Sequence, residues 1–336
     1  MAILNNKFAT SLWPIAVFAP ASAYAQPSVN YDDLASLEEP LAFEIGAATV
    51  EVKGVVDVPV TLEIEDGVHF GDVGVGFTGN FEVNAEMQLG NRWNVGVAYF
   101  GQYAENVDDY TDNVAGYIRT SWGTLVGGNV GGLVRESTRR RRGVGHAALA
   151  YDDFYGSIGR WGGGYSGRFG PVIVTGIVDG DGDFEVGAEY QRPLGSKDYR
   201  FATRFGRSHY LTPDGLANLQ TTSVGAVGEV IFGSSLFDLG ISYENFDGGG
   251  INVDRWFVSG GGQTKVGSFS LSAGGHYGEL DGTSEASAAV GIGYDIARGL
   301  STNLGLNARR ARVARGGIQI IDDEETSATA SVRYSF

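Results

Sequence analysis

The residues best suited to chemistry are concentrated in one segment, 132–154. Its charged members are Arg135, Glu136, Arg139, Arg140, Arg141, Arg142, Asp152 and Asp153. Arginine stays charged at any working pH, so these side chains could form a charged functional site in which the arginines pair with the nearby carboxylates or with anions. The alternative is a solvated surface patch or a contact with anionic lipopolysaccharide, because blocks of like charge are usually exposed.

Two glycine-containing motifs have a simpler structural interpretation. The segment 74–79 is a literal G-x-G-x-x-G, but apolar alternation continues through it to Phe81 and Val83, so it does not open a helix as a nucleotide site requires. The segment 179–183 reads Asp-Gly-Asp-Gly-Asp, yet its sixth and twelfth positions do not carry the glycine and glutamate of an EF-hand. We expect a tight turn there, with loose Ca²⁺ binding by Asp179, Asp181 and Asp183 left open.

The sequence offers no convincing catalytic or metal-binding constellation. The histidines are isolated from one another, and no H-E-x-x-H motif occurs: His69, His146, His209 and His276. Ser208 adjoins His209, but neighbours in a strand point to opposite faces. The absence of cysteine excludes disulfides and a cysteine nucleophile. We therefore expect no enzyme activity, no cofactor and no metal.

The composition restricts the fold class. Of the 336 residues, 53 are glycine, 43% are hydrophobic, and the formal net charge is −16. The acidic balance excludes nucleic acid as a partner, and the apolar content argues against disorder. Outside residues 1–25 no apolar run is long enough for a membrane-spanning helix. What remains is an all-β chain, either soluble or closed into a membrane barrel.

The first residues have the features of an export signal. Lys7 precedes the apolar segment Leu12–Ala19, and Ala23-Tyr24-Ala25 provides a small-x-small cleavage site. We expect residues 1–25 to be a signal peptide. Residues 26–48 lack alternation and are expected to form an N-terminal extension.

From Thr49 onward the dominant pattern has a period of two. Apolar residues occupy even positions from Val50 to Ile64, and then odd positions from Val73 to Leu89. Soluble strands average about 5 to 6 residues, whereas a tilted membrane crossing requires about 9 to 11. Residues 49–336 therefore predict a transmembrane antiparallel β-barrel with sixteen strands. The expected strands are 49–64, 70–89, 92–103, 113–121, 124–131, 155–166, 171–178, 184–192, 198–207, 220–232, 236–245, 252–262, 268–278, 286–295, 301–309 and 326–336.

The connections alternate in length. Tight turns follow every second strand, and the intervening connections are mostly longer, at 104–112, 132–154, 208–219, 279–285 and 310–325. Short periplasmic turns and long extracellular loops are typical of outer-membrane barrels.

The end of the chain and one internal hairpin resemble a known family. Ala328, Ala330, Val332, Tyr334 and Phe336 share one strand face, and Phe336 is the final residue. This closing strand, with the hairpin 115–125, resembles the Gram-negative general porins. The resemblance implies a barrel with sixteen strands, usually trimeric, in which small hydrophilic solutes diffuse. It also implies that the third long loop, 132–154, folds into the lumen and narrows it.

Family constrictions oppose wall arginines to acidic loop residues, and strand parity identifies lumen-facing arginines. The expected constriction residues are Arg119, Arg135, Arg139, Arg140, Arg141, Arg142, Asp152, Asp153, Arg160, Arg200 and Arg204. The sequence departs from the enterobacterial pattern in lacking a Pro-Glu-Phe-Gly-Gly loop motif and in placing Glu82 and Glu86 on the second strand's lumen side. With so many loop arginines, we expect a weak preference for anions.

The leading hypothesis is passive transport of small hydrophilic solutes and ions through a homotrimeric porin in the outer membrane. Its other expected partners are membrane lipid and lipopolysaccharide. One alternative is a channel specific for a sugar or phosphate. A more remote alternative is a barrel enzyme or an adhesin.

Overall fold

The computed structural model describes residues 41–65, 69–104, 109–141, 143–159, 161–195, 197–315 and 318–336. The expected signal peptide, residues 26–40 of the expected extension, Arg142 and Arg160 lie outside the described residues. Within these ranges, no helix is long and apolar enough to cross a membrane.

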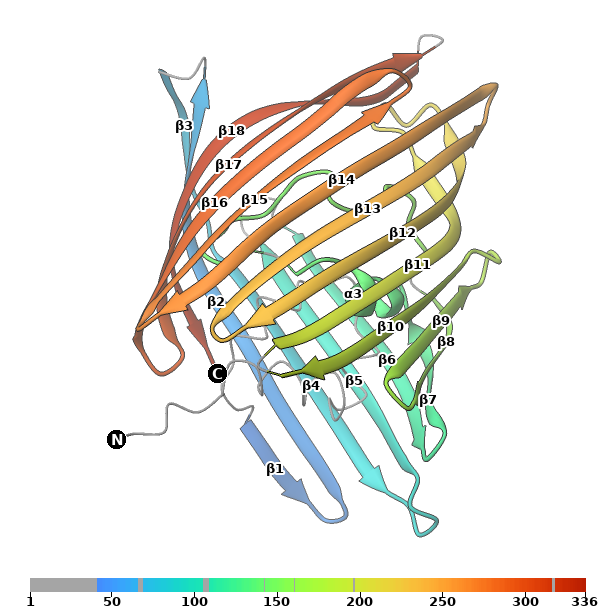
Figure 1. Ribbon diagram of the computed structural model, residues 1–336. Helices are drawn as coiled ribbons and strands as arrows, with labels where there is room; N and C mark the ends of the chain where they lie inside the picture. Colours follow the sequence, from blue (N-terminus) through green and yellow to red (C-terminus); the bar gives the residue numbers. More distant parts are fainter. Residues whose placement is uncertain are drawn as a thin grey trace.

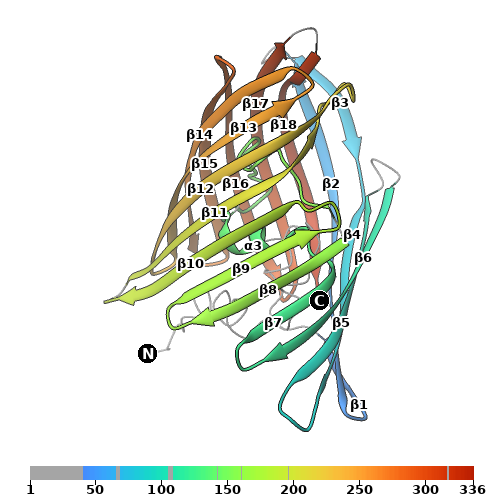
Figure 2. The same cartoon turned by 90° about the vertical axis from the view of Figure 1, so that its right-hand side faces the viewer.

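The chain forms one antiparallel sheet that closes on itself (Figures 1 and 2). Its strands are β1 (Leu41–Ile45), β2 (Ala48–Glu65), β3 (His69–Val75), β4 (Thr78–Gln88), β5 (Asn94–Ala104), β6 (Asp109–Thr120), β7 (Gly123–Asn129), β8 (Trp161–Phe169), β9 (Val172–Asp179), β10 (Phe184–Leu194), β11 (Lys197–Leu211), β12 (Asn218–Phe232), β13 (Ser235–Gly248), β14 (Ile251–Val266), β15 (Phe269–Leu280), β16 (Thr283–Ala297), β17 (Leu300–Arg315) and β18 (Ile318–Ser335). Consecutive strands pair from β4 to β18, and β18 then pairs with β2, which pairs with β4.

The sheet has 18 strands, but the barrel has sixteen positions around its wall, as predicted. Strand β3 continues into β4 after a break at Gly76, and both pair with β2. Strand β1 pairs with the first part of β2, while β18 pairs with the second part. Neither β1 nor β3 therefore adds a position to the closed ring.

The two faces of the wall differ in polarity, as the period of two predicts. On β13, Phe237, Leu239 and Ile241 are exposed on the outside, whereas the alternate residues Asp238 and Glu244 face inward. Alternation places successive side chains on opposite faces of a strand. An apolar exterior around a polar interior is the pattern of a membrane barrel.

The barrel closes where the last strand meets the second. The amides of Gly54 and Phe336 donate to each other's carbonyls, both at 3.0 Å, and Arg333 contacts Asp57 at 2.9 Å. A Cβ at Gly54 would lie 2.5 Å from the Phe336 ring. Glycine at this position therefore makes room for the terminal aromatic side chain.

Several boundaries differ from those predicted. The chain enters the sheet at Leu41, within the expected extension, because β1 pairs with β2 despite having no alternation to reveal it. Half of the expected connection 208–219 belongs to β11 and β12, and the ends of β5 and β6 overlap 104–112. The expected long connections 279–285 and 310–325 are largely strand, since β15, β16, β17 and β18 extend into them. In the last of these, cross-strand pairs such as Arg309–Glu325, 2.7 Å apart, sustain pairing in a highly charged sequence.

In the described part of the chain, the longest connection is 130–160, between β7 and β8, and its described residues lie inside the barrel. It begins with the helix α3 (Leu133–Thr138), which Figures 1 and 2 show in the lumen. This constriction loop, as residues 130–160 are called below, is longer than the predicted 132–154. Leu133 and Val134 pack with Ile158 and Ile177 in an apolar cluster. Gly187 on the wall provides space, since a Cβ there would lie 2.5 Å from Thr138.

Candidate pore constriction

The first part of the constriction loop, residues 130–141, is called its outgoing arm below. Wall residues of β10, β11 and β12 hold this arm. Arg200 contacts Glu189 at 3.1 Å and Glu229 at 2.8 Å. Its guanidinium also donates to the carbonyls of Ser137, at 2.6 Å, and Arg139, at 3.2 Å. These carbonyls end the short helix α3, so a wall cation satisfies acceptors that the helix leaves unpaired.

Asp153 joins the two arms of the loop to the wall. Its carboxylate pairs with Arg135 of α3 and with Arg204 of β11. The Arg204 guanidinium also stacks over the Phe154 ring, 3.8 Å from its centroid. Burial opposes ionisation of this carboxyl, but Arg204 and Arg135 outweigh it and hold the pKa of Asp153 well below its usual range.

The described arginines of the tract, Arg139 to Arg141, form ion pairs with carboxylates instead of extending into solvent. Arg139 contacts Glu136 at 2.8 Å. Arg140 contacts Asp152 at 2.6 Å and donates from Nε to Asp238 at 2.5 Å. Each of these guanidiniums can orient the loop while its charge is largely neutralised by its partner.

Arg141 continues the tract and reaches Glu229 at 3.2 Å. The Glu229 carboxylate thus forms ion pairs with both Arg141 of the loop and Arg200 of the wall. Arg139, Arg140 and Arg141 therefore lie among inward-facing wall residues, and the exposed-patch alternative is wrong for them. Burial raises the pKa of Asp152, although Arg140 opposes the shift.

The tip of the loop, residues 143–148, reaches the opposite wall at β15, β17 and β18. Ser272 of β15 accepts from the Val144 amide and donates to its carbonyl, both at 3.0 Å. Asn307 of β17 donates to the His146 carbonyl at 3.0 Å. The His146 ring lies 2.6 Å from the Ser331 hydroxyl. The loop therefore spans the lumen instead of ending in it.

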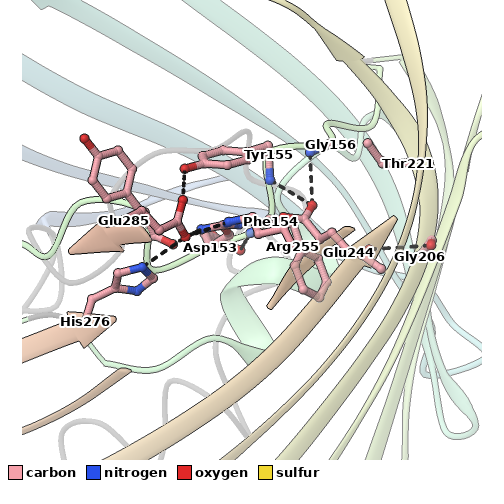
Figure 3. Close-up of polar contacts among 12 residues, drawn as sticks. Asp153, Phe154, Tyr155, Gly156, Gly206, Thr221, Glu244, Arg255, His276 and Glu285 are labelled. Carbon is pink, nitrogen blue, oxygen red and sulfur yellow. Dashed lines mark hydrogen bonds and ion pairs between the residues drawn. The ribbon is translucent and has the colours of Figure 1, made fainter. Parts of the chain in front are cut away.

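The last part of the loop, residues 151–159, is its returning arm. Arg255 of β14 holds this arm in place (Figure 3). Arg255 contacts Glu244 at 2.6 Å and Glu285 at 2.7 Å, and it is stacked on Tyr155, 3.8 Å from the ring centroid. It also donates to the Asp153 carbonyl at 2.8 Å. A wall arginine thereby binds loop backbone, a loop ring and two wall carboxylates together.

Neighbouring groups complete this cluster. Glu244 accepts from the Tyr155 amide at 3.0 Å, and Glu285 accepts from the Tyr155 hydroxyl at 2.8 Å. His276 lies 3.1 Å from Glu285 and 2.8 Å from the Ser259 hydroxyl. The contacts leave little freedom for the returning arm.

A cavity of about 230 Å³ lies between the loop and the wall. Its lining combines charged loop residues with aromatic ones and with small residues of β14 and β15: Arg135, Arg139, Arg140, Arg141, Asp152, Asp153, Tyr151, Phe154, Tyr155, Gly261, Gly262, Ala273 and Gly274. The cavity is thus bordered by paired charges and by aromatic rings.

The structure brings most of the expected constriction residues together. Arg135, Arg139, Arg140, Arg141, Asp152, Asp153, Arg200 and Arg204 meet around the loop. Arg119 faces the lumen but pairs with Glu86 of β4 at 3.1 Å, beside the short turn after β6. Arg142 and Arg160 lie outside the described residues.

Sequence reasoning missed the wall partners Glu189, Glu229, Asp238, Glu244, Arg255 and Glu285. Strand parity contained the signal, because Arg255 alternates with the outward residues Asp254 and Trp256. Parity identifies the face of a residue but gives no partner. Arg140 and Asp238 are 98 positions apart, and they meet only because the barrel closes and the loop folds into its lumen.

The other motifs have structural roles. The Asp179 carboxylate accepts from the amides of Gly159, Asp181 and Asp183 at 2.7–3.0 Å, which stabilises the turn between β9 and β10. Ser208 is hydrogen-bonded to Thr221 and His209 to Asp183. In the described part of the chain, no group of three or more His, Asp or Glu residues is arranged to hold a metal ion.

Comparison by sequence finds no matching protein-family model and no matching curated protein. Comparison of structures finds similar barrels. OmpT of Vibrio cholerae, an outer-membrane protein in its trimer form, has 14% identity and a TM-score of 0.67, with 86% of this chain and 100% of that chain covered. An anion-selective porin from Comamonas acidovorans has 14% identity and a TM-score of 0.64, with the same coverage.

A mutant of Rh. blastica porin is also similar, with 14% identity and a TM-score of 0.56 over 85% of this chain and 100% of that chain. The chain therefore has the fold of the Gram-negative outer-membrane porins, which is a multi-pass outer-membrane β-barrel.

Proposed function

We propose that this protein is a porin through which small hydrophilic solutes and ions diffuse passively across the outer membrane. The observation that carries the proposal is a closed barrel, apolar outside and polar inside, with a long loop secured across its lumen. Such a loop narrows the cross-section and so sets an upper size for a permeating solute. We propose a channel without enzyme activity.

The attachment of the loop at both arms and at its tip supports a constriction of fixed width. Salt bridges hold the outgoing arm to Glu229 and Asp238, and Arg255 holds the returning arm. A fixed constriction suits passive diffusion, because selection by size then needs no conformational change in each passage.

For ion selectivity we propose a weak preference for anions. Residues 130–160 contain six arginines and three acidic residues. The described arginines of this loop pair with carboxylates, however, and paired charges produce a weaker local field than free ones. This pairing is why a weak preference is proposed. The Comamonas protein is described as an anion-selective porin.

A channel specific for a sugar or phosphate is the second candidate, favoured by the cavity beside the loop. Its lining joins aromatic rings such as Tyr151 and Tyr155 to the guanidiniums of Arg135 and Arg140. Aromatic faces and charged hydrogen-bond donors would suit either solute. A specific channel should show a conductance that glucose or inorganic phosphate reduces in a saturable manner.

We propose that the protein assembles as a homotrimer surrounded by outer-membrane lipid and lipopolysaccharide. One similar structure is a trimer form of OmpT. Mild electrophoresis should show a heat-modifiable band at the trimer position, and a monomer in every mild detergent would contradict this assembly.

Swelling of proteoliposomes tests the channel function. Vesicles containing the full-length protein should swell in isotonic solutions of small sugars, and the rate should fall as the solute becomes larger. Vesicles that contain folded, heat-modifiable protein and do not swell in any small sugar would overturn the proposal.

A further inference from the structure

The interior of the barrel contains a second apolar cluster at the outer ends of its later strands. All of its members are buried, and those of β12 to β15 and β17 occupy inward positions of their strands: Ala217, Leu219, Phe246, Ile251, Val253, Leu280, Ala311, Val313, Ile320 and Ile321. They come from strands β12 to β15, β17 and β18 and from the turn before β12. An inward-facing wall residue in a water-filled barrel is expected to be polar. This outer-end cluster is an exception.

The outer-end cluster spans the interior rather than following the wall. The Tyr210 hydroxyl of β11 donates to the Ile320 carbonyl of β18 at 3.0 Å. Six strands, β12 to β17, separate β11 from β18 around the barrel. A direct hydrogen bond between them therefore means that opposite parts of this wall meet at the outer end.

Aromatic rings connect the outer-end cluster to the constriction loop. The Tyr210 ring lies 5.6 Å from the Phe246 ring in an edge-to-face arrangement, and 5.6 Å from the Tyr155 ring. Tyr155 in turn stacks on Arg255, which pairs with Glu244 and Glu285. The apolar layer thus continues directly into a buried and fully paired charge cluster.

We propose that the outer-end cluster is a permanent dry seal over the β11–β18 side of the lumen, and that Phe246, Leu280 and Ile320 thereby restrict which part of the cross-section solutes can enter. Water is excluded from an apolar constriction of this kind. The seal follows from packing alone, whereas the restriction of solutes rests on the proposed channel function.

Cysteine accessibility tests the seal, because the natural chain contains no cysteine. Leu280 is 0% exposed within the cluster, whereas Leu216, in the neighbouring outer turn, is 71% exposed. We would introduce Leu280→Cys and, as a matched control, Leu216→Cys into the full-length protein in proteoliposomes. Each would be treated with a membrane-impermeant cationic methanethiosulfonate reagent and then labelled again after denaturation.

The expected result is labelling of Leu216→Cys at least about 10-fold faster than Leu280→Cys, since a buried thiol reacts only when the site opens locally. Equal rates in folded, heat-modifiable protein would overturn the seal. If Leu280→Cys prevents folding, Ala311→Cys replaces it, because Ala311 is 1% exposed in the same cluster and the change is smaller.

Conductance tests the restriction separately. Phe246→Ala and Leu280→Ser, each in a variant that still folds, should raise single-channel conductance as the outer end admits water. Unchanged conductance in a variant whose cluster has become accessible to the reagent would overturn the restriction but leave the seal intact. Cysteine labelling requires no transport, so it tests the seal even if the protein proves not to be a porin. The absence of any conductance in the parent protein would show separately that the proposed porin function is wrong.

Discussion

Arg255 and Glu285 form a buried ion pair inside the barrel, with the guanidinium Nε 2.7 Å from a carboxylate oxygen and the residues 0% and 1% exposed. Arg255 pairs also with Glu244 and lies against the Tyr155 and Phe257 rings, 3.8 and 4.2 Å from their centroids. Charges this deeply buried are tolerated only when partners satisfy them. This ion pair belongs to the structure that holds the constriction loop in place.

Replacing Arg255 should therefore destabilise the barrel and release the returning arm. We expect Arg255→Met to lower the free energy of unfolding by about 3 to 5 kcal/mol, because Glu244 and Glu285 are left buried without a cation. Urea titration of the protein in detergent micelles measures the change.

Arg312→Met is the matched control for Arg255→Met. Arg312 is 76% exposed and its guanidinium contacts Asp322 at 2.8 Å, so solvent screens the pair and the same substitution should lower the free energy of unfolding far less than Arg255→Met does. Equal losses for the two variants would show that the Arg255 cluster has no special role.

The loop tip depends on glycine at position 291. A Cβ there would lie 1.9 Å from the Val144 carbonyl oxygen, whereas a Cβ at Gly275 would have no neighbour within 4 Å. We expect Gly291→Ala to displace the tip into the lumen and reduce single-channel conductance, while Gly275→Ala leaves it unchanged. A parental conductance for Gly291→Ala would contradict the placement of the tip.

The adjacent carboxyls Asp152 and Asp153 should respond differently to pH. The pKa of Asp153 is lowered in the folded state, so its contribution to stability is present above about pH 4 and is lost as the pH falls below it. Asp153→Asn should therefore lower the unfolding midpoint most near pH 7, and the difference from the parent should shrink towards about pH 3.

Asp152 provides the comparison, because burial raises its pKa and so favours its neutral form. The stabilisation that this shift provides is present at low pH and is lost as the pH rises through the folded-state pKa. Asp152→Asn should accordingly cost less than Asp153→Asn at about pH 7. The reverse order in urea midpoints would contradict the assignment of the two carboxyls.

Arg140 should influence ion selectivity more than a peripheral arginine does. Replacing it with glutamine leaves Asp152 and Asp238 without their shared cation. We expect Arg140→Gln to shift the reversal potential in a KCl gradient towards cation preference. Arg298→Gln, at an exposed turn, should not shift it, and equal shifts would place the selective region elsewhere.

The number of strands and the face of each wall residue could be predicted because a period of two determines both. Strand parity assigns Arg200 and Arg204 to the lumen, and both are buried there. Their partners could not be predicted, since Glu229 and Asp153 reach them only through barrel closure and loop folding.

The inward apolar residues show a second limit of the pattern. Parity places Leu219 and Phe246 on the inner face, but it cannot reveal that Tyr210 and Ile320 meet across that face. The strands also extend further than predicted, because at the outer end of β17 the alternation is reversed: Ala311 and Val313 are buried, while the exposed Arg312 pairs across the strands with Asp322.

Single-channel recording in planar lipid bilayers tests the central claim most directly. Full-length, heat-modifiable protein should insert in discrete steps of stable conductance that increases with KCl concentration, as expected of a water-filled pore with a fixed constriction. Folded protein that inserts without producing any conductance would contradict the account.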